Sequence, residues 1–122
     1  MKYELLNGAD FAYIGDACYE LMIRKYVLHT GITKLVELHE SSVKYVSKSA
    51  QNKIILKLMP ELTEDEVDIF KRGRNYKYKK NDLEYINASG FEALVGYLYL
   101  KEENERLNYI ISRAIEIIEK KE

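Results

Sequence analysis

Apolar residues recur at steps of three and four along most of the chain, a period that predicts amphipathic helices. The first helix is predicted over residues 10–29, and Gly31 is placed to end it. Its core-facing residues are Phe11, Ile14, Cys18, Leu21 and Met22. A short turn follows, in which Thr33 can cap a segment that carries three apolar residues, Leu35, Val36 and Leu38.

A second long helix is predicted over residues 41–58, and Pro60 ends it because proline disfavours a helical residue before it. Its inner stripe is Val43, Val46, Ala50, Ile54 and Leu58. Thr63 and Glu66 form a capping-box pattern that opens a third helix, and Gly73 is expected to close that helix.

Residues 75–85 are basic, polar and rich in tyrosine, which predicts a loop. Residues 87–100 are nearly all apolar, so they are expected to form a central buried helix. The last helix is predicted over residues 103–120. No alternation typical of strands competes, so the chain is predicted to be all-α, a helical bundle in a single domain, 1–122.

The composition restricts the class of protein. With 47% hydrophobic and 32% charged residues the chain is expected to be a soluble globular protein. No apolar run reaches the ~18 residues that span a bilayer, and the first residues lack the apolar segment of a signal peptide. A lone Cys18 fits a reducing compartment, so we expect a cytoplasmic protein that does not bind a membrane.

Two acidic residues, Asp16 and Glu92, stand at positions where the apolar pattern expects core. Each has small neighbours, such as Gly15 and Gly96, which allow two helices to cross closely. Paired carboxylates with room for water suit Mg²⁺, which can activate water and stabilise charge on a phosphodiester. The other interpretation is that the two carboxylates cap or salt-bridge neighbouring helices.

Basic residues are concentrated in one segment, although the net charge is only −1. Six of them fall within ten residues: Lys71, Arg72, Arg74, Lys77, Lys79 and Lys80. Such a block can bind phosphates without a basic chain as a whole. Taken alone, the block is explained more simply by a solvated loop beside a helix C-terminus, where cations are favoured in any case.

Two segments resemble the acidic motifs of the ribonuclease III family. The first is Tyr13-Ile14-Gly15-Asp16-Ala17, and the second covers residues 90–100, which begin Gly-Phe-Glu-Ala-Leu-Val-Gly. The resemblance extends over nearly the whole chain. Residues 72–75 and 105–107 and the chain length are similar to Mini-ribonuclease III, a short bacterial branch without an appended double-stranded-RNA-binding domain.

The resemblance implies an α-helical endoribonuclease that works as a homodimer and cleaves double-stranded RNA to leave 5′-phosphates. Asp16 and Glu92 would be its catalytic and metal-binding residues, with Mg²⁺ as cofactor and Mn²⁺ as a substitute. The substrate implied is the precursor of large-subunit (23S) ribosomal RNA, and a ribosomal protein or pre-ribosomal particle is a candidate accessory partner.

We expect duplex RNA to be bound through its phosphates, since A-form duplexes are recognised mainly by shape. The residues predicted to bind RNA are Lys44, Lys48, Lys71, Arg72, Arg74, Lys77, Lys79 and Lys80. Arg72 and Arg74 flank Gly73 and can instead anchor the loop. Tyr76 and Tyr78 can stack on a base or cover the apolar stem of the loop.

The chain departs from full-length ribonuclease III at two positions that are acidic there, Ala12 and Ser89. A cage of four carboxylates is therefore not expected, although Asp82 or Glu84 can supply a further acid. The departures leave an alternative function open, a catalytically inactive scaffold that binds structured RNA. A helical interaction module without an RNA role is the third hypothesis.

Overall fold

The computed structural model describes residues 1–75 and 82–120. These residues form α-helices and two short 3₁₀ helices, Tyr3–Leu5 and Met59–Glu61, and contain no strand, which confirms the all-α prediction. The α-helices are α1 (Gly8–His29), α2 (Leu35–Val46), α3 (Lys48–Leu58), α4 (Glu64–Asn75), α5 (Leu83–Leu100) and α6 (Asn104–Glu119). None of these helices is long and apolar enough to cross a membrane.

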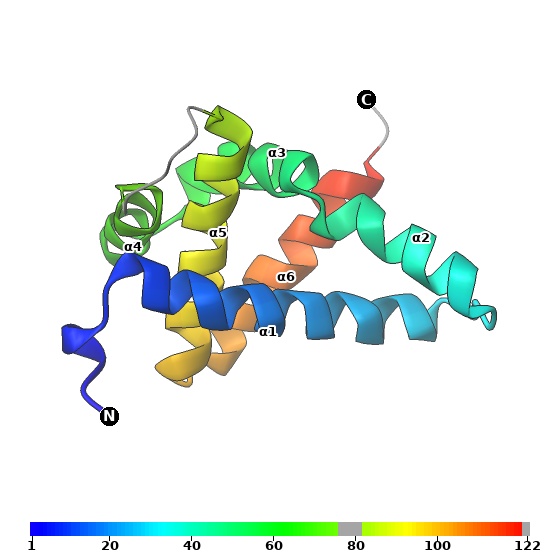
Figure 1. Cartoon of the computed structure of the whole chain (residues 1–122), viewed down its shortest axis with the longest axis horizontal. Coiled ribbons are helices and arrows are strands. Elements are labelled where there is room, and N and C mark those ends of the chain that lie inside the picture. Colours follow the sequence, from blue (N-terminus) through cyan, green and yellow to red (C-terminus); the bar gives the residue numbers. More distant parts are fainter. Residues whose placement is uncertain (76–81, 121–122) are drawn as a thin grey trace.

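Helix α5 is the centre of the bundle, as its apolar composition predicted. Every residue from Asn87 to Gly96 is buried. Helix α5 crosses α1 and is surrounded by α3, α4 and α6 (Figure 1). A helix that is buried on all sides has no polar face, which is why its sequence shows little periodicity.

Helices α1 and α5 cross with their backbones in contact. A Cβ atom added to Gly96 would lie 1.9 Å from the carbonyl oxygen of Phe11. Only glycine at the crossing point permits so close an approach. The prediction that small residues allow these two helices to cross tightly is therefore confirmed.

The buried face of α1 matches the predicted one only in part, since Phe11 is buried and Cys18 and Met22 pack against the core as expected. It is built on Phe11, Tyr19, Ile23 and Val27, whereas Leu21, predicted to face the core, is 69% exposed. The face of α1 that carries the small residues packs against α5. Leu21 lies on another face of the helix and therefore points to solvent. Apolar residues on both faces of α1 made the two orientations equally compatible with the sequence.

The helix predicted over residues 41–58 is in fact two helices separated at Ser47. Ser47 has an extended backbone (φ −61°, ψ 155°), and its hydroxyl accepts a hydrogen bond from the amide of Ala50 at 3.1 Å, which caps α3. Helix α2 also begins earlier than expected, at Leu35. The apolar pattern continues across Ser47, so periodicity alone does not show the break.

Two further boundaries differ from the prediction. Helix α4 continues past Gly73 to Asn75, and Gly73 serves packing, since a Cβ atom there would lie 2.5 Å from Cβ of Ala93. Helix α5 begins at Leu83, with Asp82 as its N-cap. The remainder of the predicted loop, residues 76–81, lies outside the described residues.

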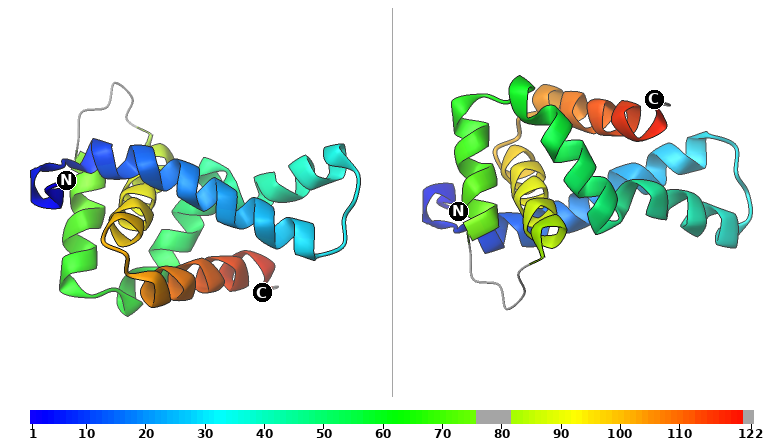
Figure 2. Two further views of the ribbon diagram at one scale, coloured as in Figure 1. Left: turned by 90° about the horizontal axis from the view of Figure 1, so that it is seen from below. Right: turned by 90° about the horizontal axis from the view of Figure 1, so that it is seen from above.

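Other predicted helix ends are confirmed. Gly31 follows the end of α1 with a left-handed backbone (φ +95°) that favours glycine. The capping box is present, because the Thr63 amide donates to Glu66 Oε1 at 2.9 Å and the Glu66 amide donates to Thr63 Oγ1 at 3.2 Å. Seen from the sides, α1 and α2 form a hairpin whose tip extends away from the other helices (Figure 2).

Candidate active site

Asp16 and Glu92 line the same pocket, at the crossing of α1 and α5. Its volume is about 310 Å³, enough for a hydrated ion. Helix α3 closes one side of it. The lining residues of this acidic pocket are Ala9, Ala12, Tyr13, Asp16, Lys48, Tyr85, Ser89 and Glu92. The crossing therefore brings together two carboxylates that are remote in sequence.

The two carboxylates differ in burial. Glu92 is 4% exposed, in keeping with its core-like position in the sequence. Asp16 is exposed, so the expectation that it also occupies a core position is wrong. The buried face of α1 includes Ala12 and Gly15, and Asp16 lies beside that face at the mouth of the acidic pocket.

Two side chains from α3 donate to the same oxygen of Glu92. Lys48 Nζ lies 3.1 Å and Gln51 Nε2 lies 3.4 Å from Glu92 Oε2. Burial raises the pKa of the Glu92 carboxyl to about 7, because it disfavours the charged form. Lys48 opposes this shift, and the negative charge of Asp16 adds to it. The negative charge of Asp16 thus disfavours ionisation of Glu92, a repulsion that a bound cation would relieve.

The donor set of the acidic pocket fits Mg²⁺. Mg²⁺ takes oxygen ligands and is commonly held by one or two carboxylates, with waters and substrate phosphates completing its shell. Gln51 Oε1 is buried without a hydrogen-bond partner in the part of the chain described, so the amide beside Glu92 keeps an unused acceptor for a water molecule. Within residues 1–75 and 82–120, no group of three or more acidic, histidine or cysteine side chains is placed to hold an ion.

Ala12 and Ser89 line the acidic pocket beside the two carboxylates. The two positions at which the chain departs from the pattern of full-length ribonuclease III thus face the candidate metal site. Asp82 and Glu84 do not line the acidic pocket, and Asp82 caps α5 by accepting from the amides of Glu84 and Tyr85 at 3.1 and 3.3 Å. The hypothesis that either residue completes the acidic cluster gains no support.

The residues predicted to bind RNA occupy different environments. Lys48 lines the acidic pocket, and Lys44 and Lys71 are exposed on α2 and α4. Arg72 donates to the carbonyl oxygen of Leu6 at 2.7 Å, an anchoring role for the N-terminal segment. The guanidinium of Arg74 lies over the ring of Phe70, 5.7 Å from its centroid. The other members of the predicted set and its two tyrosines lie outside the described residues: Lys77, Lys79, Lys80, Tyr76 and Tyr78.

Sequence reasoning missed Gln51. The signal that was available is a glutamine one turn from Lys48 on the apolar side of the helix, with apolar Ile54 one turn further on. A buried amide needs partners, and Glu92 is one of them. Recognising this in advance required knowing that the chain breaks at Ser47 and that α3 packs against α5.

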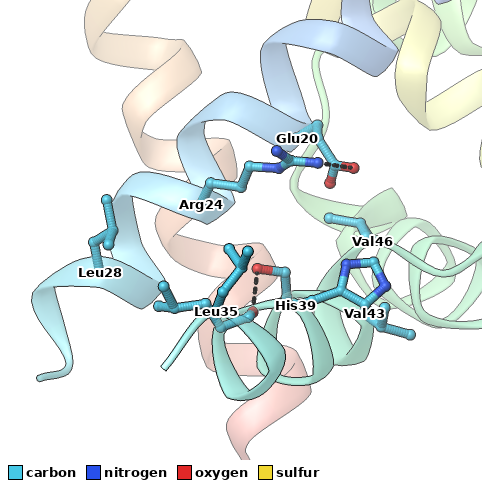
Figure 3. Close-up of a pocket in the computed structure, with 9 residues that line it drawn as sticks. Glu20, Arg24, Leu28, Leu35, His39, Val43 and Val46 are labelled. Carbon is cyan, nitrogen blue, oxygen red and sulfur yellow. Dashed lines mark hydrogen bonds and ion pairs between the residues drawn. The ribbon is translucent and has the colours of Figure 1, made fainter. Parts of the chain in front are cut away.

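A second concavity, the apolar groove, lies between the C-terminal half of α1 and α2. Figure 3 shows Leu28, Leu35 and Val43 around it, with the ion pair of Arg24 and Glu20 at one side. The pair, Nη2 to Oε1 at 3.5 Å, is an ordinary i,i+4 contact along α1. The groove lacks paired carboxylates, so it does not compete with the acidic pocket as a metal site.

Comparison with known proteins identifies the family. Residues 9–103 match the model of the Ribonuclease III domain. The chain is 43% identical to Mini-ribonuclease 3 of Symbiobacterium thermophilum over 94% of this chain and 92% of that one, and 42% identical to Mini-ribonuclease 3 of Streptococcus pneumoniae over 94% and 95%. A crystal structure of a protein from Fusobacterium nucleatum superposes with a TM-score of 0.85 at 32% identity, covering 95% of this chain and 98% of that one. The chain therefore belongs to the ribonuclease III family of endoribonucleases, in the group named Mini-ribonuclease 3.

Proposed function

We propose that this endoribonuclease is Mg²⁺-dependent and cleaves double-stranded RNA at the acidic pocket. The observation that carries the proposal is the meeting of Asp16 and Glu92 in one pocket of a ribonuclease III fold. Mn²⁺ has similar ligand preferences and is expected to substitute for Mg²⁺. The products are expected to carry 5′-phosphates, as the family resemblance implies.

Asp16 and Glu92 would hold the cation from α1 and α5. When bound, the ion supplies a Lewis acid for the phosphate and activates a water molecule. The exposed Asp16 faces solvent, from which the RNA backbone arrives, whereas the buried Glu92 is held by Lys48 and Gln51. The small side chain of Ala12 leaves coordination sites to water and phosphate.

The RNA duplex would be held by the basic side chains predicted from the sequence. Lys48 lines the acidic pocket, and exposed Lys44 and Lys71 are available for phosphates. Arg72 and Arg74, which already contact Leu6 and Phe70, would contribute their remaining donors from the end of α4, next to the segment with the other three predicted lysines. Phosphate contacts make the affinity depend on salt, and the loss becomes steeper with the number of contacts, so binding should weaken between about 50 and 200 mM salt.

A second copy of this chain is the expected partner on the exposed face of α1. Tyr13, Leu21 and Leu28 are 82%, 69% and 58% exposed on that face, and Leu35 and Val36 continue the apolar surface on α2. So large an exposed apolar surface is typical of an interface. In the homodimer, two acidic pockets would serve one duplex, one for each strand.

The biological substrate proposed is the precursor of 23S ribosomal RNA, in keeping with the resemblance to the short branch of the family. That assignment implies work in the cytoplasm, with a ribosomal protein or pre-ribosomal particle as a candidate helper. Cleavage of a duplex formed by the two ends of the precursor, compared with an unrelated duplex of equal length, tests it. Equal rates on the two duplexes would contradict the assignment.

The main test uses a defined duplex RNA, with and without Mg²⁺. Asp16→Asn and Glu92→Gln should each lower kcat by at least about 100-fold, because each removes a charged ligand of the ion that stabilises developing charge. Glu20→Gln is the matched control, since Glu20 lies one turn from Asp16 and pairs with Arg24 instead. Cleavage by Asp16→Asn at the rate of the parent would refute the proposal.

An inactive scaffold that binds structured RNA remains the second candidate. Two carboxylates in place of four, owing to Ala12 and Ser89, favour it. A scaffold would bind duplex RNA as tightly as an enzyme but leave it intact with Mg²⁺ or Mn²⁺. Absence of both binding and cleavage would instead favour the third hypothesis, an interaction module.

A further inference from the structure

The N-terminal turn of α3 provides two hydrogen-bond donors to one atom, Oε2 of Glu92. Lys48 Nζ lies at 3.1 Å and Gln51 Nε2 at 3.4 Å, and neither of these hydrogen bonds involves Oε1. Both donors reach Glu92 because the break at Ser47 starts α3 in a new direction. The two donors differ in charge and in freedom of movement.

Gln51 is a fixed neutral donor. It is 2% exposed, and its Nε2 also donates to the carbonyl oxygen of Val46 at 2.9 Å, at the end of α2. The amide is therefore held from two sides, by α2 and by α5. A buried side chain with both contacts has little freedom to leave when a ligand enters the acidic pocket.

Lys48 is a charged donor whose side chain is partly exposed. Its side chain is 41% exposed, and it is the first residue of α3. Its ammonium lies 5.5 Å from the centre of the Tyr85 ring at the edge of the acidic pocket. A lysine side chain has four rotatable bonds, so the ammonium can move toward solvent without any change of the backbone.

We propose that Lys48 is the resident counter-ion of Glu92 in the metal-free enzyme, which an entering divalent cation displaces toward the RNA, while Gln51 remains and orients the carboxylate. The inference rests on the proposed function, since it takes Glu92 as a ligand of the cation. An ammonium and Mg²⁺ at one carboxylate repel each other, so occupancy by the metal favours a Lys48 conformer at the rim of the acidic pocket. There the ammonium is available to a phosphate of the duplex.

The two donors to one oxygen should therefore have opposite effects on metal binding. Removing the charge of Lys48 relieves a repulsion, so Lys48→Met should bind Mg²⁺ about threefold to tenfold more tightly. Removing the donor of Gln51 leaves Glu92 without its fixed orientation. Gln51→Leu should therefore bind Mg²⁺ about tenfold more weakly, a typical loss for a residue that orients a metal ligand.

The experiment measures Mg²⁺ affinity without RNA, by the increase of melting temperature over each variant's own metal-free value and by calorimetry. Using each variant's own baseline separates metal binding from any loss of stability in Gln51→Leu. Lys48→Arg retains the charge and should bind Mg²⁺ as the parent does. Lys53→Met removes an exposed charge from the same helix and is the matched control, with no change expected.

The kinetics supply a second measurement. Lys48→Met should raise KM for duplex RNA more than it lowers kcat, because the displaced ammonium binds substrate, whereas Lys53→Met should change neither. Unchanged or weaker Mg²⁺ binding by Lys48→Met would overturn the displacement, and unchanged binding by Gln51→Leu would overturn the orienting role. Parent-like Mg²⁺ binding by Glu92→Gln would instead overturn the proposed metal site itself, so the two failures are distinguishable.

Discussion

A Cβ atom added to Gly15 would lie 1.7 Å from the backbone carbonyl oxygen of Glu92. A close approach of α1 to α5 thus occurs at the residue that carries the buried carboxylate. Asp16 follows Gly15 directly, so the same contact sets the distance between the two acidic side chains. The fold and the candidate site depend on one crossing.

Gly15→Ala should destabilise the protein by at least about 2 kcal/mol, because the added methyl group meets backbone that cannot move aside. Alanine is the better helix former, so helix propensity alone predicts that Gly15→Ala stabilises the protein. Ala17→Gly, at an exposed position of the same helix, is the control and should cost only about 1 kcal/mol. Urea denaturation of the metal-free proteins measures both, and a smaller loss for Gly15→Ala would contradict the crossing.

Glu92→Gln should make the metal-free protein more stable, by about 1 kcal/mol. The parent carries the cost of a buried carboxylate beside Asp16, and its partner Lys48 can return to solvent when the charge is removed. Melting in the presence of a chelator at pH 8, where the Glu92 carboxyl with a pKa of about 7 is largely ionised, measures the difference.

The matched variant is Glu66→Gln, since Glu66 is also 4% exposed. Burial raises the pKa of Glu66, but hydrogen bonds from Arg106, at 2.7 and 2.8 Å, and from Thr63 outweigh it and leave the pKa below its usual value. Glu66→Gln should therefore destabilise the fold. If both glutamate variants lose stability, Glu92 is a structural ion pair and not a site held ready for a cation.

Ser89→Asp should increase the affinity for Mg²⁺ about tenfold, because it adds a carboxylate to the acidic pocket. The same change should lower the stability of the metal-free protein, since Ser89 is 3% exposed and close to Glu92. Ser49→Asp, an exposed position on α3, is the control. Thermal shift against Mg²⁺ concentration measures both effects, and an unchanged affinity would place the cation elsewhere.

Leu21→Arg should weaken dimerisation by at least about tenfold, since it puts a charge into the apolar face of α1. The substitution should not harm the fold, because Leu21 is 69% exposed. Leu56→Arg is the control, at a 56% exposed leucine of α3. Sedimentation equilibrium distinguishes the monomer from the dimer. A parent that is monomeric at micromolar concentration, or equal dissociation of both variants, would refute an interface on α1.

Glu61 should contribute stability that acid removes. Hydrogen bonds from Arg113, the shortest at 2.8 Å, and from Tyr109 lower the pKa of the Glu61 carboxyl to about 2 in the folded protein, against an ordinary value of 4.5. Because the folded pKa lies below the unfolded one, the unfolded state binds the proton first as the pH falls. The stabilisation is complete above pH 4.5 and is lost between pH 4.5 and 2.

Glu61→Gln should therefore show a shallower loss of unfolding free energy between pH 4.5 and 2 than the parent. Denaturant titrations at several pH values give the slope. Glu64→Gln, in the first turn of α4, is the control and should keep the slope of the parent. An equal slope for Glu61→Gln would show that the contacts with Arg113 and Tyr109 do not survive in solution.

The sequence was sufficient for the helical class, for the central position of α5 and for the capping box at Thr63 and Glu66. It also predicted that Asp16 and Glu92 approach each other, because small residues flank both positions and permit a close crossing. These properties depend on local signals, namely the helical period, the capping residues and the absence of side chains at a contact. Such signals can be read one segment at a time.

The tertiary structure decided which residues those segments bury and where they bend. Either the face of α1 with Leu21 or the face with the small residues could have been buried, and α5 packs against the face with the small residues. The break at Ser47 is not visible in the period, yet it directs Lys48 and Gln51 at Glu92. Burial and hydrogen bonding of a side chain depend on what packs against it, and the partner lies on another helix, so no local pattern specifies them.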